Sequence, residues 1–271
     1  MHDVLKPHQP DFQDRPMLRK IWTEVFGDPP DLVDLFYAYF PPEESAWVLR
    51  SGHEIVSVAY LVTGNLFVSG ENQRRAAYIY AVATQKLHRS NGYSGQLMRY
   101  LAQLAEENDY LLYTSPAEQS LFPWYEKHIH TKRASFLRLD SAVLQPSDLL
   151  PITHLSSTEY GVKREHFLRD QPHIAASAQF LALQEAFLKR EGGGFYAVGA
   201  CCCACERADN SVRIKEIHGP DQEVHAAIQS IMRRFEVETA LVPVSDDAGK
   251  ATVAYRAAED LQAANWGFLL D

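Results

Sequence analysis

Long apolar runs are missing from this sequence. No segment approaches the about 20 consecutive apolar residues that a helix needs to span a bilayer. Residues 1–10 are polar, include an acid and hold no apolar stretch of signal-peptide length. We therefore expect a soluble, cytoplasmic protein with no membrane partner. Of the 271 residues, 46% are hydrophobic, so the chain can bury a sizeable core and a disordered chain is not expected.

Basic residues are too few for a protein whose main partner is nucleic acid. Lysine and arginine number 26 against 35 carboxylates, which gives a formal net charge of -9. Nucleic acid and anionic membranes both require a basic face, so neither is predicted as a partner. A cationic amine substrate would suit the negative electrostatic potential of such an acidic chain.

Cysteine is scarce as well. All four cysteines stand in the apolar segment 201–205. Alternation along a strand would put Cys201, Cys203 and Cys205 on one face and Cys202 on the other. Because buried free cysteine commonly packs as a small hydrophobe, a structural role is favoured over metal or redox chemistry. No metal site is predicted.

Carboxylates are absent from one long segment of this acidic chain. By simple proportion a segment of this length should hold roughly four, yet residues 72–105 hold none. The same segment carries five cations, which are Arg74, Arg75, Lys86, Arg89 and Arg99. A buried strand and an apolar helix face would exclude charge of either sign, but they do not explain the cations. An anion site is therefore the favoured interpretation.

The order of elements inside this segment agrees with an anion site. The sequence predicts a buried strand over 77–83, a basic turn with a glycine, and an amphipathic helix that begins near Tyr93. The free N–H groups and positive dipole end of that helix would face the turn, beside Lys86 and Arg89. A phosphate-bearing cofactor fits such a site. A nucleotide hydrolase is disfavoured because no Gly-Lys-Ser/Thr follows the turn.

The whole pattern predicts two α/β blocks. The first should hold helices over 15–27, 31–40, 93–104 and 121–130, and strands over 47–50, 55–63, 66–69, 77–83, 110–114 and 134–139, with a turn at Gly64-Asn65. The second should hold helices over 160–169, 173–191 and 223–235, and strands over 195–206, 212–218, 239–244 and 252–256. Prolines and serines in 141–157 place the boundary at 145/146.

Each block contains one strand–helix–strand unit. In the first block the right-handed crossover puts the basic turn at the carboxyl end of the sheet, where ligands usually bind. In the second block Asp221 and Glu223 occupy the helix start. Carboxylates there satisfy the helix dipole and would repel a phosphate, so a second copy would be silent. Independent α/β patterning explains the likeness equally well.

One segment resembles a known family. Val82-Ala-Thr-Gln-Lys-Leu-His-Arg-Ser-Asn-Gly-Tyr-Ser-Gly is similar to motif A of the GNAT superfamily of acyl-CoA N-acyltransferases, with the core Gln/Arg-x-x-Gly-x-Gly/Ala. The core reads Arg89-Ser-Asn-Gly92-Tyr-Ser94 here, with serine as the last small residue. The helix end Ile21-Trp-Thr-Glu-Val-Phe-Gly-Asp and the segment Leu121-Phe-Pro-Trp-Tyr125-Glu-Lys fit the family in order. The family often continues with Leu-Gly-Phe, where this chain has His128-Ile-His.

The resemblance implies a fold and a domain arrangement. Residues 1–145 would form an α/β GNAT catalytic domain, a mixed, mostly antiparallel sheet with a central parallel βαβ unit. Residues 146–271 would form a second, degenerate GNAT-like α/β domain. This looks like the tandem arrangement of Eis-like proteins, without their third domain because the chain is too short to hold one.

The resemblance also implies an activity and its residues. Acetyl-CoA would donate an acyl group to a primary amine that attacks the thioester directly. The splayed strand end Val82, Ala83 and Thr84 would hold the pantetheine arm, and the Val82 N–H would polarise the thioester carbonyl. The pyrophosphate would lie on the turn, formed by Arg89, Ser90, Asn91, Gly92, Tyr93, Ser94 and Gly95. Tyr125, a phenol with a pKa of about 10, would protonate the thiolate, although spacing alone favours a core aromatic.

The general base and the acceptor stay open. No carboxylate lies in the strand 77–83, so the candidates for the base are Glu118, Glu126, His128, His130 and the terminal carboxylate of Asp271, or a chain of waters. No more than two aromatics are expected to touch a small-molecule amine, among Phe36, Tyr37, Tyr39, Phe40, Tyr78 and Tyr80. The alternative function is a CoA-binding sensor without transferase activity. The sequence leaves a homo-oligomer open.

Overall fold

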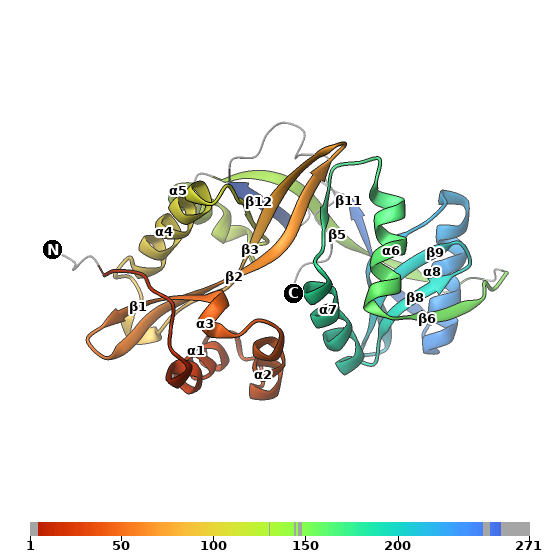
Figure 1. Ribbon diagram of the computed structural model, residues 1–271. Helices are drawn as coiled ribbons and strands as arrows, with labels where there is room; N and C mark the ends of the chain where they lie inside the picture. The colour runs from red at the N-terminus through yellow and green to blue at the C-terminus, as the bar shows by residue number, and fades with distance from the viewer. Residues whose placement is uncertain (1–4, 130, 144, 146–147, 246–249, 256–271) are drawn as a thin grey trace. The chain divides into compact units, whose positions relative to one another are not determined.

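The computed structural model describes residues 5–129, 131–143, 145, 148–245 and 250–255. Contacts divide them into two compact units (Figure 1). The first is built mainly from residues 5–67, 74–134 and 252–255, and the second mainly from 135–245. The domain boundary that the sequence predicts at 145/146 stays a prediction. The division of contacts falls between residues 134 and 135, and residues 252–255 return to the first unit.

Apolar spacing produces the helices that open the first unit. After the short turn η1 (Phe12–Asp14), helix α1 (Arg15–Phe26) buries Leu18, Ile21 and Trp22 and ends at Gly27, whose φ of 81° closes the helix in the left-handed region. Helices α2 (Pro30–Tyr39) and α3 (Pro42–Ser45) follow, each with a proline in its first turn. The two predicted helices are confirmed.

The sheet of the first unit has the spatial order β1 (Ala46–Ser51), β2 (Glu54–Ser69), β3 (Asn72–Thr84), β4 (Leu111–Thr114) and β12 (Lys250–Tyr255). The pairs β1/β2 and β4/β12 are antiparallel, whereas β3/β4 is parallel. Helix α4 (Tyr93–Glu107) connects β3 to β4. The predicted mixed sheet with a parallel βαβ unit at its centre is confirmed.

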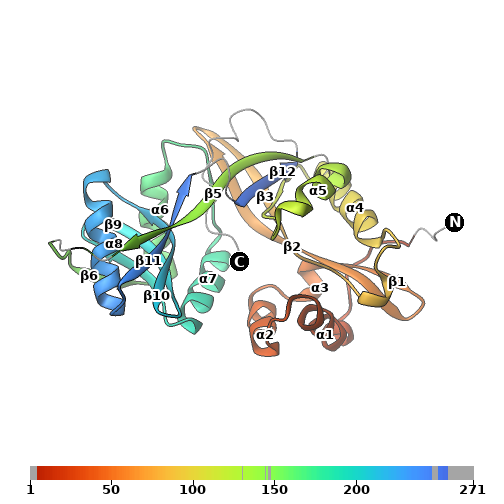
Figure 2. The same ribbon diagram turned by 180° about the vertical axis from the view of Figure 1, so that it is seen from behind.

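Helices cover both faces of this sheet. Trp22 of α1 packs on Tyr60 and Tyr80 of the sheet, and Trp47 on β1 packs on Tyr100 of α4. Seen from both sides (Figures 1 and 2), α1 to α3 lie on one face, and α4 and α5 (Phe122–Ile129) lie on the other. The edge between these layers, at the carboxyl end of β3, is therefore the open part of the unit.

Two expectations for the first unit were wrong. The predicted turn at Gly64-Asn65 does not exist, since β2 runs through it as one strand. Gly64 adopts a φ of 95°, and Asn65 is buried and donates from Nδ2 to Tyr113 Oη at 3.2 Å. The strand expected over 252–256 in the second block lies in the first sheet instead, as β12 against β4, and Arg256 is outside the described residues.

In the second unit the strands have the spatial order β5 (Thr131–Val143), β11 (Thr239–Ser245), β10 (Ser211–His218), β9 (Cys201–Ala208), β8 (Gly194–Val198) and β6 (Ile152–Leu155). Its helices are α6 (Ser157–Leu168), α7 (Ala178–Arg190) and α8 (Asp221–Phe235), and β7 (His173–Ala175) is a short strand. The cysteines are all free and buried. As predicted, Cys201, Cys203 and Cys205 pack on the α8 face and Cys202 packs on the α6 and α7 face.

Two boundaries in the second unit were wrong. The apolar run 195–206 forms a hairpin rather than one strand, because Gly199 turns the chain with a φ of 58°. The helix expected from His173 begins only at Ala178, where Ser177 caps it by accepting from Phe180 N. Residues His173–Ala175 form the short strand β7 instead, and His173 Nε2 lies 2.9 Å from Glu165 Oε2.

The two units share one order of elements. In the first unit α1, α2, β1, β2, β3, α4 and β4 follow one another, and in the second α6, α7, β8, β9, β10, α8 and β11 do, apart from the short helix α3, the short strand β7 and the short 3₁₀ turns. In each unit the last two strands of the series are parallel. The two units are thus similar in the order of these elements.

A buried ion pair ties α6 to the sheet of the second unit. A bulge between Ile214 and Glu216 breaks the alternation of β10 and turns Glu216 toward α6. Its carboxylate accepts from Arg164 at 2.8 and 3.1 Å and from Tyr160 Oη at 2.7 Å, and all three side chains are buried. Burial alone would raise the pKa of Glu216, but Arg164, and then His218, hold it well below its usual range.

We predict that Glu216→Gln lowers the free energy of unfolding by about 3 to 5 kcal/mol, because it leaves the Arg164 guanidinium buried without a counter-charge. The depressed pKa stabilises the fold above the unfolded value near pH 4, and this contribution is lost as the pH falls through the folded value. The difference between wild type and variant in urea unfolding should therefore shrink below about pH 4. Asp170→Asn, at a side chain that is 90% exposed, serves as the control and should change little. Equal stability of Glu216→Gln and wild type at pH 7 would contradict the prediction.

Candidate functional site

The carboxyl end of β3 leaves its parallel neighbour. The pairing of β3 with β4 spans Ala76–Tyr78, and Ala81 then adopts a φ of 45°, which is unusual for a residue with a Cβ. On the β2 side, Gln85 N donates to Val56 O and Ser57 Oγ donates to Ala83 O. Strand alternation therefore directs the backbone groups of Val82 and Thr84 away from β2, into the opening beside β4.

The turn after β3 is shaped by left-handed residues. After η2 (Lys86–His88), Ser90 has a φ of 65° and Gly92 a φ of 78°. Asn91 Nδ2 donates to His88 O within the turn. Helix α4 starts at Tyr93 directly after Gly92, which has no side chain to accept the first N–H groups. These N–H groups remain available for an anion.

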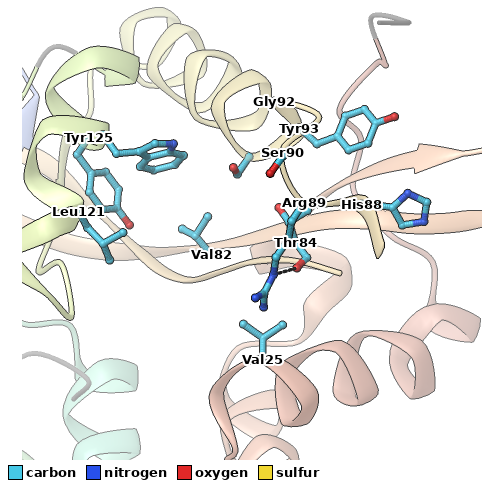
Figure 3. Close-up of a pocket in the computed structure, with 12 residues that line it drawn as sticks. Val25, Val82, Thr84, His88, Arg89, Ser90, Gly92, Tyr93, Leu121 and Tyr125 are labelled. Atoms are coloured by element: carbon cyan, nitrogen blue, oxygen red, sulfur yellow. Dashed lines mark hydrogen bonds between the residues drawn. The ribbon is translucent and has the colours of Figure 1, made fainter. Parts of the chain in front are cut away.

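A cavity of about 360 Å³ lies at this opening (Figure 3). Its lining combines predicted and unpredicted residues: Val25, Val82, Thr84, His88, Arg89, Ser90, Gly92, Tyr93, Ser94, Leu121, Trp124 and Tyr125. In Figure 3 the Tyr125 hydroxyl points toward Val82, while His88 and Tyr93 lie at the opposite end. The cavity therefore joins the strand end, the turn and helix α5 in the first unit.

Three predicted residues do not line the cavity. Ala83 is buried against β2, and the Asn91 side chain bonds within its own turn. Gly95 lies beneath the His128 ring, and a Cβ on it would stand 2.8 Å from His128 Nδ1. The backbone groups of these residues still belong to the strand end and the helix start that border the cavity.

Sequence reasoning missed four lining residues. Val25 was assigned only to an amphipathic helix, and Leu121 and Trp124 were seen only as neighbours of Tyr125. His88, within the motif, pairs through Nε2 with Glu54 Oε2 at 3.2 Å. A helix face that points to a ligand looks the same in sequence as one that points to a core, so the pattern could not separate them.

The lining is divided by polarity. Thr84, Arg89 and the turn residues make a polar, cationic half, in which Arg89 Nε donates to Thr84 O at 3.3 Å. Leu121 and Tyr125, together with Trp124, make an apolar half, and Val82 lies between the two. Val25 lies next to Arg89 in the same view. Such a cavity can hold the phosphates of a ligand at one end and its reactive group beside Val82.

Tyr125 is the titratable group of the apolar half. Its side chain is 6% exposed, and burial raises its pKa to about 12, against a hydrogen bond with Thr114 that lowers it. A phenol with this pKa stays protonated at neutral pH, so it can donate a proton to a developing anion. It is also part of the core, as the apolar spacing of its helix predicts, and its role as a proton donor stays a prediction.

The candidates for the base are placed less favourably. Glu118 and Glu126 are exposed, and His130 and Asp271 lie outside the described residues. His128 packs on α4, and its pKa is lowered by burial and by Arg99. Because a guanidinium only donates, Arg99 Nη1 donates to His128 Nδ1 at 3.0 Å, which leaves the proton of the neutral ring on Nε2. The base stays open.

The six candidate aromatics for the acceptor mostly form core. Four of them are buried, namely Phe36, Tyr37, Phe40 and Tyr78, while Tyr39 and Tyr80 are half-buried. Tyr80 packs on Trp22 and Phe36, two residues before Val82. Contact with an amine stays a prediction for any of them.

Among residues 5–255, apart from the gaps given above, no three His, Cys, Asp or Glu side chains come together as metal ligands would. No described helix combines the length and the apolar character required to cross a membrane.

Comparison with known proteins finds a family model that matches part of the first unit. Residues 12–128 match the family described as Acetyltransferase (GNAT) domain. This segment contains every lining residue of the cavity. A sequence comparison with curated proteins gives no match.

Solved structures extend the likeness to both units. GCN5-related N-acetyltransferases from Anabaena variabilis and Kribbella flavida align with TM-scores of 0.73 and 0.72 at 12% identity, over 92% and 93% of this chain and 72% and 71% of theirs. Eis1 from Mycobacterium abscessus aligns with a TM-score of 0.62 at 10% identity, over 89% of this chain and 67% of its own. At these identities the likeness shows a shared fold.

We predict that Gly95→Ala destabilises the protein, because the added Cβ collides with the His128 ring. Overpacking of this kind costs about 1 to 3 kcal/mol, against a gain of up to about 1 kcal/mol from the higher helix propensity of alanine. In a His128→Ala background the collision is absent, so the same substitution should stabilise. Urea unfolding of the four proteins measures both effects. The same sign of the effect in both backgrounds would contradict the prediction.

Proposed function

We propose that this protein is an acyl-CoA-dependent N-acyltransferase that moves an acyl group, most simply acetyl, to a primary amine. The observation that carries the proposal is the divided cavity at the opened end of β3, which lies wholly in the segment matching the GNAT acetyltransferase family. An anion-binding turn and a protonated phenol meet there on either side of Val82. Thioester aminolysis needs both.

In this proposal the polar half holds the donor. The N–H groups of residues 90–95 at the start of α4, together with the Arg89 guanidinium, hold the pyrophosphate of acetyl-CoA. The backbone of Val82, Ala83 and Thr84 holds the pantetheine arm. The N–H of Val82, directed into the opening by strand alternation, donates to the thioester carbonyl oxygen and stabilises the oxyanion.

Transfer then follows by direct attack. The amine nitrogen forms a bond to the carbonyl carbon, whose oxygen takes the electron pair. When the C–O double bond re-forms, the C–S bond breaks and sulfur leaves with its electron pair. Tyr125 gives its phenolic proton to that thiolate, and the nitrogen loses one proton. The acceptor is a small-molecule amine.

The surplus proton leaves the amine through water in this scheme. The described lining of the cavity contains no carboxylate, and its histidine, His88, lies at the end away from Tyr125. An amine that enters partly neutral needs only a water chain to lose its remaining proton. This arrangement favours amines with lowered basicity and a rate that rises with pH until the amine is neutral.

We further propose that residues 146–271 form a second, degenerate GNAT-like domain that does not bind the donor. Its repeated order of elements supports this. Its helix α8 carries Asp221 and Glu223 in the first turn, and Glu223 Oε2 accepts from Ala200 N at 2.9 Å. A Cβ on Gly219 would stand 2.8 Å from Cys201 Cβ, so the turn before α8 is closely packed. A pyrophosphate would meet both a charge and a filled turn.

We predict that acetyl-CoA binds the wild type in isothermal calorimetry and that Gly92→Glu weakens binding at least about tenfold, because a carboxylate then faces the pyrophosphate. Gly52→Glu is the matched control. Gly52 also has a positive φ, 61°, and open space around it, but it lies in the β1–β2 turn. The control should bind like the wild type. No binding by the wild type at millimolar acetyl-CoA, or equal losses in both variants, would remove the donor site.

We predict that Tyr125→Phe lowers kcat about 100-fold or more with an amine panel, while the Kd for acetyl-CoA is unchanged, since a general acid acts only in the transition state. With a pKa of about 12, Tyr125 stays protonated, so no loss of activity from its ionisation should occur up to about pH 10. Tyr100→Phe, on the face of α4 that contacts Trp47, is the control. Tight binding without turnover by the wild type would favour a CoA sensor instead.

A further inference from the structure

Helices α4 and α5 contact each other next to the cavity. Trp124 and His128 stand one turn apart on α5, so they share a face of that helix, and Gly95 and Arg99 are related in the same way on α4. The His128 ring centroid lies 5.0 Å from that of Trp124, which lies 4.9 Å from that of Tyr125. Trp124 and Tyr125 line the cavity, whereas His128 does not. His128 therefore contacts this wall of the cavity from outside.

The His128 ring fits onto the first two turns of α4. Gly95 is the third residue of that helix, and a Cβ on it would stand 2.9 Å from His128 Nε2, so the ring lies against the backbone where another residue would carry a side chain. One turn further on, Arg99 Nη1 donates to His128 Nδ1 at 3.0 Å. His128 is also where this chain departs from the Leu-Gly-Phe that often follows in the family, so the resemblance does not account for it.

The hydrogen bond from Arg99 requires the neutral ring, because a guanidinium only donates and Nδ1 accepts only while it carries no proton. Among the described residues, Arg99 of α4 and Lys127 of α5 are the cations that act on the ring. Burial, then these two cations, lower the pKa of His128 below its ordinary value. At about pH 8 the ring is therefore neutral and the contact is formed.

Of the two helices, α4 is the more firmly placed. It has 15 residues and buries Leu97, Met98 and Leu101 in the core of the first unit. Helix α5 has 8 residues, which are too few for a helix to be stable without tertiary contacts. The position of α5 therefore depends on the contacts that its side chains make. The hydrogen bond between Arg99 and His128 is a directional contact of this kind.

We infer that His128 is a positioning residue that fixes the wall formed by Trp124 and Tyr125 at its distance from the start of α4. The inference rests on the proposed transferase function. There the pyrophosphate lies on the start of α4 and the thioester lies beside Val82, so the pantetheine arm runs along this wall. A ligand that contacts two helices binds more tightly when their separation is fixed beforehand, because less ordering is left to binding. Loss of the His128 contact should therefore weaken the hold on the arm and spare the hold on the phosphates.

Calorimetry at about pH 8 with two ligands tests the inference. One ligand is acetyl-CoA, and the other is adenosine 3′-phosphate 5′-diphosphate, the half of CoA without the arm. His128→Leu fills the space without an acceptor, and His128→Asn offers an amide oxygen in place of Nδ1. We expect His128→Leu to raise the Kd of acetyl-CoA about 5- to 10-fold and that of the nucleotide by less than about twofold, and His128→Asn to stay within about twofold of the wild type for both. Equal losses for both ligands, or an Asn variant as weak as the Leu variant, would overturn the inference.

A second measurement needs no ligand. Histidine labelled with ¹⁵N in the ring gives a His128 signal that is assigned by its absence in His128→Asn. We expect the proton on Nε2 in the neutral ring, and in Arg99→Met, at an exposed side chain, we expect the pKa of His128 to rise because the guanidinium that lowers it is gone. A proton on Nδ1, or an unchanged pKa in Arg99→Met, overturns the inference.

The same experiments separate this inference from the proposed function. A wild type that binds acetyl-CoA but transfers nothing overturns the transferase, and the two Kd ratios then still decide whether His128 positions the wall for the donor. A wild type that binds no acetyl-CoA overturns the donor site and the role of His128 in it.

Discussion

The separation of β3 from β4 after Tyr78 is the constraint on which the site depends. Paired strands hydrogen-bond each other's N–H and C=O groups. A strand end that leaves its neighbour therefore leaves these groups free to bind a ligand in the opening. The left-handed Ala81 marks where β3 bends away. The opening costs strand hydrogen bonds, and the fold keeps it because β2 on the other side still holds Ala83 and Gln85.

The distribution of charge follows from that opening. A helix start without a capping side chain would favour a carboxylate nearby, and Asp221 and Glu223 supply one at α8. The start of α4 has no such carboxylate, because it lies in a segment of 34 residues without an Asp or Glu. In the proposed function an external anion takes the place of that carboxylate, which would explain the acid-free segment better than burial does. Gly219 also packs closely on Cys201, so the turn before α8 lacks space for a phosphate.

Periodicity could predict the helices and the central βαβ unit because their apolar faces repeat within a dozen residues. It could not predict partners that lie far apart in the chain. Gly64-Asn65 has the composition of a turn, yet Asn65 lies inside a strand, where it donates a hydrogen bond to the Tyr113 hydroxyl, 48 residues away. Residues 252–255 likewise join the first sheet through β4, which no local pattern can indicate.

The candidate site was predictable for a different reason than the fold. The turn from Arg89 to Ser94 needs particular residue types, since Gly92 must adopt a positive φ and a bulky residue at Ser94 would crowd a backbone-bound phosphate. Such demands act on a few consecutive positions and therefore remain visible in one sequence.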